Sequence, residues 1–146
     1  MAIDGRTTGL TVLRICIGVF FIFEGIGKLS WFTDTSLLAE QLRNWSHAVS
    51  SSSPSHVYLV RIAIPGVPIF ARLVPLGEIV SGVALVAGFW TPLFAFVLFF
   101  MALNFQFASG ALFKYSFLTS GYGLPVLGST LALALAGLRK RKIPWA

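Results

Sequence analysis

The chain has 146 residues, of which 56% are hydrophobic and only 11% are charged, and its formal net charge is +6. So little charge excludes a water-soluble domain of ordinary composition, in which about 25% of the residues are charged. Apart from the run 139–142, the basic residues are scattered, which excludes a nucleic-acid-binding patch. We interpret the excess of positive charge as a signal that sets the membrane topology, with anionic lipid as its contact.

Four apolar segments are long enough to span a lipid bilayer as helices. They cover residues 9–29, 72–89, 92–110 and 122–138. We therefore predict one all-α domain over residues 1–146, an integral membrane four-helix bundle. The first segment contains Arg14 and Glu24 and no small-residue cleavage site follows it, so we expect it to be retained as a span rather than removed as a signal peptide.

The first segment has one face on which basic residues and glycines share a helical stripe. At helical spacing this face contains Arg14, Gly18, Phe21, Gly25 and Lys28. The two glycines allow a second helix to approach closely. Glu24 lies at the edge of the stripe, four residues before Lys28, which is the favourable order for an ion pair within a helix.

The connection 30–71 is more polar than the segments on either side. Residues 36–49 place Leu37, Leu38, Leu42 and Trp45 near one side, which predicts a short amphipathic helix at the membrane interface or on the bundle. Pro65 and Pro68 are expected to break any long helix after it. Whether residues 56–70 enter the membrane is left open by the sequence.

The second apolar segment, 72–89, contains one carboxylate, Glu78. An ionisable group at this depth is costly in lipid, so it must face protein or water and find a partner. Helical spacing puts Glu78 on a face with the small residues Ser81 and Gly82. Lys28 is the partner that the topology favours, because a direct bond from Arg14 would need helix tilt or a linking water.

Further charge pairing is expected between Arg72 and Glu24, so that the predicted network comprises Arg14, Glu24, Lys28, Arg72 and Glu78. Two interpretations of this network remain open. The charges could only lock the first two helices together. Alternatively, they could form a polar pocket that holds a quinone head group or relays protons.

The third and fourth segments carry fewer polar groups. Asn104 and Gln106 lie about 200° apart on a helix, and we expect Asn104 to face the bundle centre and to be a second candidate for quinone contact. In the fourth segment Gly128, Ala132 and Ala136 form a stripe of small residues suited to helix packing. The basic run 139–142 should stay in the cytoplasm, and four spans then place both termini there.

Resident redox centres are not indicated by the sequence. The two histidines, His47 and His56, both fall in the polar connection, where haem ligands facing the bundle interior are not expected. Cys16 is the only cysteine, so a disulfide within the chain or a paired-cysteine redox motif is excluded. We predict neither a metal site nor a covalently bound cofactor, with quinone as the one cofactor left possible.

Two spaced motifs resemble a known family. Arg14-x3-Gly18-x6-Gly25-x2-Lys28-Leu29, followed by Pro75-x2-Glu78-x3-Gly82-x2-Leu85-x2-Gly88, is similar to the pattern of the DoxX family of small four-helix membrane proteins. The resemblance implies a multi-pass protein of the bacterial inner membrane. It also implies a link to membrane redox complexes, since the family takes its name from a thiosulfate:quinone oxidoreductase subunit. The family's recurring charged positions match Arg14, Lys28 and Glu78.

Three functions follow from these observations as hypotheses. The first is an accessory or anchoring subunit of a membrane redox complex, bound to other membrane subunits and without its own metal or haem. The second is a quinone-interacting oxidoreductase subunit, with Glu78 accepting a proton and Lys28 or Arg14 polarising a carbonyl; these three residues are the candidate catalytic groups. The third is a small transporter or proton path.

Overall fold

The structure is a computed structural model, which describes residues 5–112 and 114–139. In this part of the chain every regular element is helical, as predicted. In chain order the elements are α1 (Gly5–Gly27), η1 (Leu29–Phe32), α2 (Ser36–Ala48), α3 (Pro54–Tyr58), η2 (Leu59–Ala63), α4 (Val67–Ala87), α5 (Thr91–Ala108), α6 (Tyr115–Thr119) and α7 (Leu124–Arg139).

Membrane-crossing length is reached by three helices among the described residues. They are the Thr7–Gly27 part of α1, α4 (Val67–Ala87) and α5 (Thr91–Ala108). The apolar part of α7, Leu124–Gly137, is shorter. At 1.5 Å per residue it measures about 21 Å, compared with about 30 Å for the hydrocarbon core of a bilayer. The structure thus supports three of the four predicted spans by length and composition.

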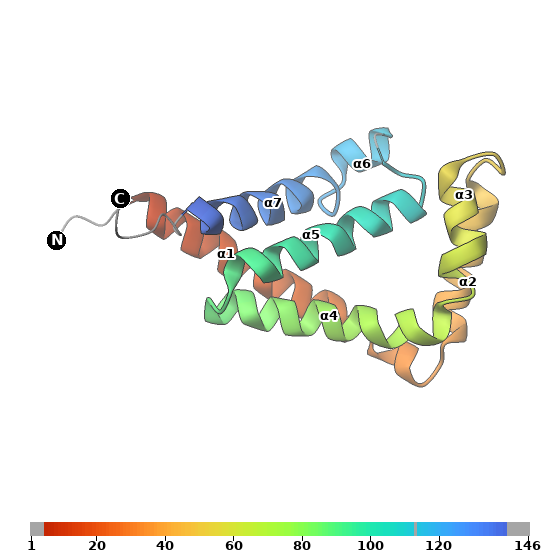
Figure 1. The fold of residues 1–146 in the computed structure, drawn as a ribbon, viewed down its shortest axis with the longest axis horizontal. Helices are drawn as coiled ribbons and strands as arrows, with labels where there is room; N and C mark the ends of the chain where they lie inside the picture. Colours follow the sequence, from red (N-terminus) through yellow and green to blue (C-terminus); the bar gives the residue numbers. More distant parts are fainter. Residues whose placement is uncertain (1–4, 113, 140–146) are drawn as a thin grey trace.

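The long helices lie side by side in two pairs, α1 with α4 and α5 with α7 (Figure 1). A tight turn joins α4 to α5, and α4 ends at Gly88, whose φ of 77° is in the left-handed region where glycine is favoured. The start of α1 and the end of α7 lie at the end of the bundle where this turn is found. The hairpin of α2 and α3 crosses the opposite end (Figure 1).

Glycines bring α1 and α4 close together. A Cβ atom added to Gly18 would lie 2.7 Å from the carbonyl oxygen of Gly82, and one added to Gly82 would lie 2.7 Å from that of Gly18. Both predicted faces are confirmed: Phe21 of α1 and Ser81 and Gly82 of α4 are buried. Close backbone approach therefore replaces side-chain interdigitation along the middle of this helix pair.

The connection between α2 and α4 differs from the prediction. The helix of the second span begins at Val67 rather than Arg72, and Pro68 lies in its first turn. Proline is tolerated there because its missing N–H has no partner within the first turn of a helix. The chain breaks instead at residues 64–66, where Pro65 lies in a turn. The predicted break in this section is therefore present, but it falls at Pro65, and Pro68 begins the next helix rather than interrupting one.

The predicted amphipathic helix is present as α2, with Leu38 and Leu42 buried in a core shared with α4 and η2. Leu37 was expected on the same side, but 43% of its surface is exposed. Just before α2, the O–H and N–H of Ser36 donate to the Asp34 carboxylate, and these hydrogen bonds hold the pKa of Asp34 below its usual value.

Candidate functional site

A cluster of three charged side chains joins α1 to α4 at the end of the bundle next to α2. Lys28 Nζ donates to both carboxylate oxygens of Glu78, each at 2.8 Å, and to Glu24 Oε2 at 3.0 Å. Glu78 is 0% exposed, the side chain of Lys28 is 15% exposed and that of Glu24 is 36% exposed. The buried carboxylate is thus paired through an ammonium that lies between it and the partly open Glu24.

Local structure explains why these groups meet. Helix α1 ends at Gly27, and the backbone N–H of Lys28 donates to the Gly25 carbonyl, so Lys28 directly follows the last turn. Gly25 itself lies against α4: a Cβ there would be 2.8 Å from the Pro75 carbonyl oxygen and 3.2 Å from Glu78 Cβ. The absence of a side chain at Gly25 lets Glu78 come within hydrogen-bond distance of Lys28.

Aromatic and polar groups from α5 and the segment before α7 surround the cluster. Lys28 Nζ lies 5.4 Å from the centroid of the Phe105 ring, within the range of a cation–π interaction. Tyr122 is near enough to Glu78 and Glu24 to interact electrostatically with both. The backbone of Tyr122 is held by Gln106, whose Nε2 donates to the Tyr122 carbonyl at 3.3 Å.

The charges of the cluster do not cancel. Two carboxylates share one ammonium, which leaves a formal charge of −1 when all three groups are ionised. In an apolar setting such a surplus favours binding of a proton or of a group that donates hydrogen bonds. Lys28 can polarise a carbonyl, and Glu24, which is partly exposed, connects the buried pair to the outside.

The other residues of the predicted charge network lie elsewhere. Arg72 is exposed, and its Nη1 donates to the Pro68 carbonyl at 2.7 Å rather than to Glu24. Arg14 lies beside Gly88, which is ten residues after Glu78 on α4, so about 15 Å of helix separates Arg14 from that carboxylate. The two ion pairs recorded among the described residues involve neither arginine.

The polar residues of α5 also differ from expectation. Gln106 is the buried one, with 8% of its surface exposed, whereas Asn104 is exposed and lines a cavity of only about 40 Å³ beside α2. The choice of Asn104 as the residue facing the bundle centre was wrong. Rotation about the helix axis could not be fixed from the sequence, because α5 is apolar on all sides and has no clear buried face.

The predicted small residues fall into two groups. Gly18, Gly25 and Gly82 lie in the contact between α1 and α4. On α7, Gly128 and Ala132 are exposed, and apart from the neighbouring backbone of α7 no atom of the described residues lies within 4 Å of a Cβ added to Gly128. Ala136 is half-buried, at the wall of a groove between α1, α5 and α7. Gly128 and Ala132 therefore face away from the subunit, whereas Ala136 faces the groove.

The comparison with protein-family models decides the family. The model described as DoxX matches residues 9–111, well over half of the chain. The chain belongs to the DoxX family. Comparisons with curated proteins and with solved structures returned no match.

The DoxX match covers most of α1 and all of α2 to α5, and so includes the full charge cluster of Glu24, Lys28 and Glu78. Tyr122, which lies beyond the matched region, was missed by the sequence argument. Its position at the start of the fourth apolar segment was the available signal, since such a tyrosine can face the interior of a bundle. In residues 5–112 and 114–139 of this DoxX chain, no three His, Cys, Asp or Glu side chains gather as a metal site.

Proposed function

We propose that this DoxX-family protein is an accessory or anchoring subunit of a membrane redox complex in the bacterial inner membrane. In this proposal α7 is a fourth span and both termini lie in the cytoplasm. Membership of the family supports the link to redox complexes, and one observation supports an anchoring role: Gly128 and Ala132 on α7 are turned outward, where a helix of another subunit could approach.

The geometry of α7 supports an intermolecular contact. Its inner face packs on α5 and α1 through Val126, Leu127, Leu133 and Ala134, which are all buried. Its outer face has Gly128 and Ala132 one turn apart, both exposed. Small residues at this spacing let helix backbones come close in a membrane, where association depends on packing rather than on the hydrophobic effect. A helix of a partner subunit could therefore pack closely against the outer face of α7.

Replacing Ala132 by leucine should disrupt this contact while leaving the subunit folded, because the added side chain points away from the bundle. We expect the amount of co-purified partner to fall about tenfold or more when tagged protein is extracted from native membranes in a mild detergent. Ala87→Leu is the matched control, since Ala87 is also exposed but lies on α4. Equal partner recovery from Ala132→Leu and wild type would contradict a contact through α7.

Quinone binding at the charge cluster is the second candidate function. The observation that favours it is the position of Lys28 Nζ, which is held by two carboxylates and lies over the Phe105 ring. An ammonium next to an aromatic ring can polarise a quinone carbonyl while the ring stacks on the head group. Glu78, paired with that ammonium, would then accept or release the proton.

Glu78→Gln should abolish quinone binding with little effect on folding, since glutamine keeps the size of the side chain and Lys28 retains Glu24 as a partner. We expect quinone extracted with the purified protein to fall about tenfold or more, measured by chromatography of the lipid extract. Glu40→Gln on the exposed side of α2 is the control. Unchanged quinone content in Glu78→Gln would leave the cluster with a structural role only.

A further inference from the structure

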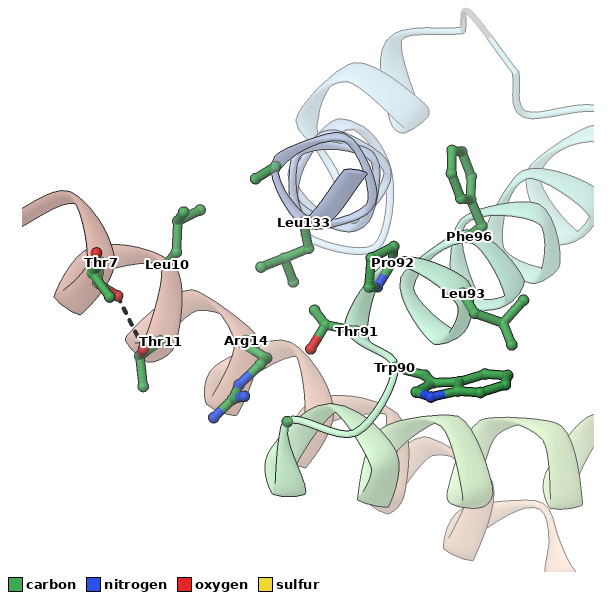
Figure 2. Close-up of a pocket in the computed structure, with 13 residues that line it drawn as sticks. Thr7, Leu10, Thr11, Arg14, Trp90, Thr91, Pro92, Leu93, Phe96 and Leu133 are labelled. Carbon is green, nitrogen blue, oxygen red and sulfur yellow. Dashed lines mark hydrogen bonds between the residues drawn. The ribbon is translucent and has the colours of Figure 1, made fainter. Parts of the chain in front are cut away.

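A second candidate site lies at the opposite end of the bundle from the charge cluster. It is a groove of about 590 Å³ between α1, the turn from α4 to α5, and α7, and Figure 2 shows the side chains around it. Its volume falls within the range of about 300–1,000 Å³ that is usual for sites of small ligands. Among the residues whose side chains the structure describes, Arg14 is the one charged residue that lines it.

Arg14 is not paired within the described protein. Its Nε is buried and has no hydrogen-bond partner, and neither recorded ion pair involves this residue. The guanidinium lies against Gly88, and a Cβ atom added to that glycine would collide with Nη1. The C-terminal end of α4 provides favourable electrostatics for a cation, but no carbonyl of α4 accepts a hydrogen bond from Arg14. A guanidinium has five N–H donors, so the donors on Nη1 and Nη2, which pair with no described residue, are left for a ligand in the groove.

The remaining walls suit a ligand with a polar head and apolar tails. Thr11 and Thr91 line the groove together with Arg14, and so do the apolar residues Leu10, Leu93 and Leu133. In Figure 2 the Thr91 side chain lies between Arg14 on α1 and Leu133 on α7. A planar guanidinium with adjacent hydroxyl groups is a typical partner of a phosphate group.

The level of the groove along the bundle matches that of lipid head groups. Gly88 ends α4 and Thr91 begins α5, so Arg14 lies at the height where two long apolar helices terminate. Trp90 in this turn is 61% exposed and stacks on Phe89, as expected of an aromatic side chain at a membrane surface. Trp90 also has a φ of 41°, an unfavourable value for a bulky residue, and such strain is concentrated at functional sites.

Charge complementarity favours an anionic lipid. The helix α7 ends at Arg139 at this end of the bundle, and the sequence continues with Lys-Arg-Lys. Basic residues near a membrane surface attract anionic phospholipids. We propose that the groove binds the phosphate head group of an anionic phospholipid through Arg14, with the first carbons of its acyl chains against the leucines. This proposal is independent of the redox role.

The test uses purified protein in nanodiscs of phosphatidylcholine that contain a small fraction of phosphatidylglycerol. Native mass spectrometry then counts the lipids that stay bound after the nanodisc is removed. We expect wild type to retain one phosphatidylglycerol, and retention to fall about tenfold or more in Arg14→Gln. Arg72→Gln is the matched control, since it removes the same charge from an exposed side chain at the other end of α4 and should retain the lipid.

Two further measurements make the outcome decisive. Ala136→Phe fills the groove without changing its charge and should also lose the lipid, and circular dichroism checks that every variant stays helical. Millimolar inorganic phosphate should not displace the lipid, because the apolar walls hold the chains. The proposal would be overturned by any one of three results. Arg14→Gln could retain as much phosphatidylglycerol as wild type, wild type could retain as much phosphatidylcholine as phosphatidylglycerol, or inorganic phosphate could displace the lipid.

Discussion

Lys28→Met will lower the free energy of unfolding by about 3–5 kcal/mol, which is the usual cost of removing one partner from a buried ion pair. The cost is high here because Glu78 is 0% exposed and both of its oxygens accept from Lys28 Nζ at 2.8 Å. Without the ammonium, Glu78 and Glu24 would remain as two uncompensated carboxylates. The measurement is thermal or denaturant unfolding of the purified protein in a mild detergent, followed by circular dichroism.

A double variant separates the cost of an orphaned charge from a general loss of packing. Lys28→Met combined with Glu78→Leu removes both members of the buried pair, and we expect it to recover most of the lost stability, because a well-packed apolar pair is often as stable as a buried ion pair. Arg72→Met is the single-site control, with an expected change within about 0.5 kcal/mol. If Lys28→Met were as stable as Arg72→Met, the ion pair would not stabilise the fold.

Much of the fold follows from hydropathy and spacing, because each long helix must satisfy its own backbone in lipid. The faces of α1 and α4 were predictable because a few residues, such as Gly18 and Glu78, cannot face lipid at low cost. The apolar helix α5 has no such constraint, and its rotation was predicted wrongly at Asn104. Helix starts were equally uncertain, since Pro68 can break a helix or begin one, depending on which turn it occupies.

The charge cluster was partly foreseeable as well. The spacing of Glu24 and Lys28 predicts a pair on one helix, and the cost of burying Glu78 predicts a basic partner from another helix. Which basic residue meets Glu78 depends on the register of α1 against α4, and the close approach at Gly25 sets that register. Whether Tyr122 lies near the charge cluster depends on the path of the chain between α5 and α7, and hydropathy does not determine that path.

The interface of α1 with α4 thus has three parts. Lys28 and Glu78 hold one end, Gly18 and Gly82 are in backbone contact in the middle, and Arg14 lies against Gly88 at the other end. The middle part is the least tolerant of change, because backbone atoms cannot move aside as a flexible side chain can. The Lys28–Glu78 ion pair lies on one side of this contact and the groove at Arg14 lies on the other. Both depend on the distance between α1 and α4, so a side chain added at the contact should affect both ends of the helix pair.

Gly82→Leu will therefore be among the most destabilising single changes in the chain, at the upper end of the roughly 1–3 kcal/mol that overpacking costs, or beyond it. A Cβ at this position would lie 2.7 Å from the Gly18 carbonyl oxygen and 3.0 Å from the backbone N of Ile22. The helices must separate to admit it, and the Lys28–Glu78 bonds should lengthen in consequence. Unfolding in detergent, monitored by circular dichroism, measures the loss.

Gly128→Leu is the matched control, because it adds the same side chain to a helical glycine whose added Cβ would meet no described residue outside its own helix backbone within 4 Å. The isolated subunit should keep its stability or gain up to about 1 kcal/mol, since leucine favours a helix more than glycine does. In native membranes the same variant should lose the partner proposed to dock on α7. If Gly82→Leu and Gly128→Leu destabilised the isolated subunit equally, Gly128 would have to be packed against the rest of the subunit. That result would contradict the open face at Gly128, and it would show that the contact at Gly82 is no less tolerant of a side chain than other positions.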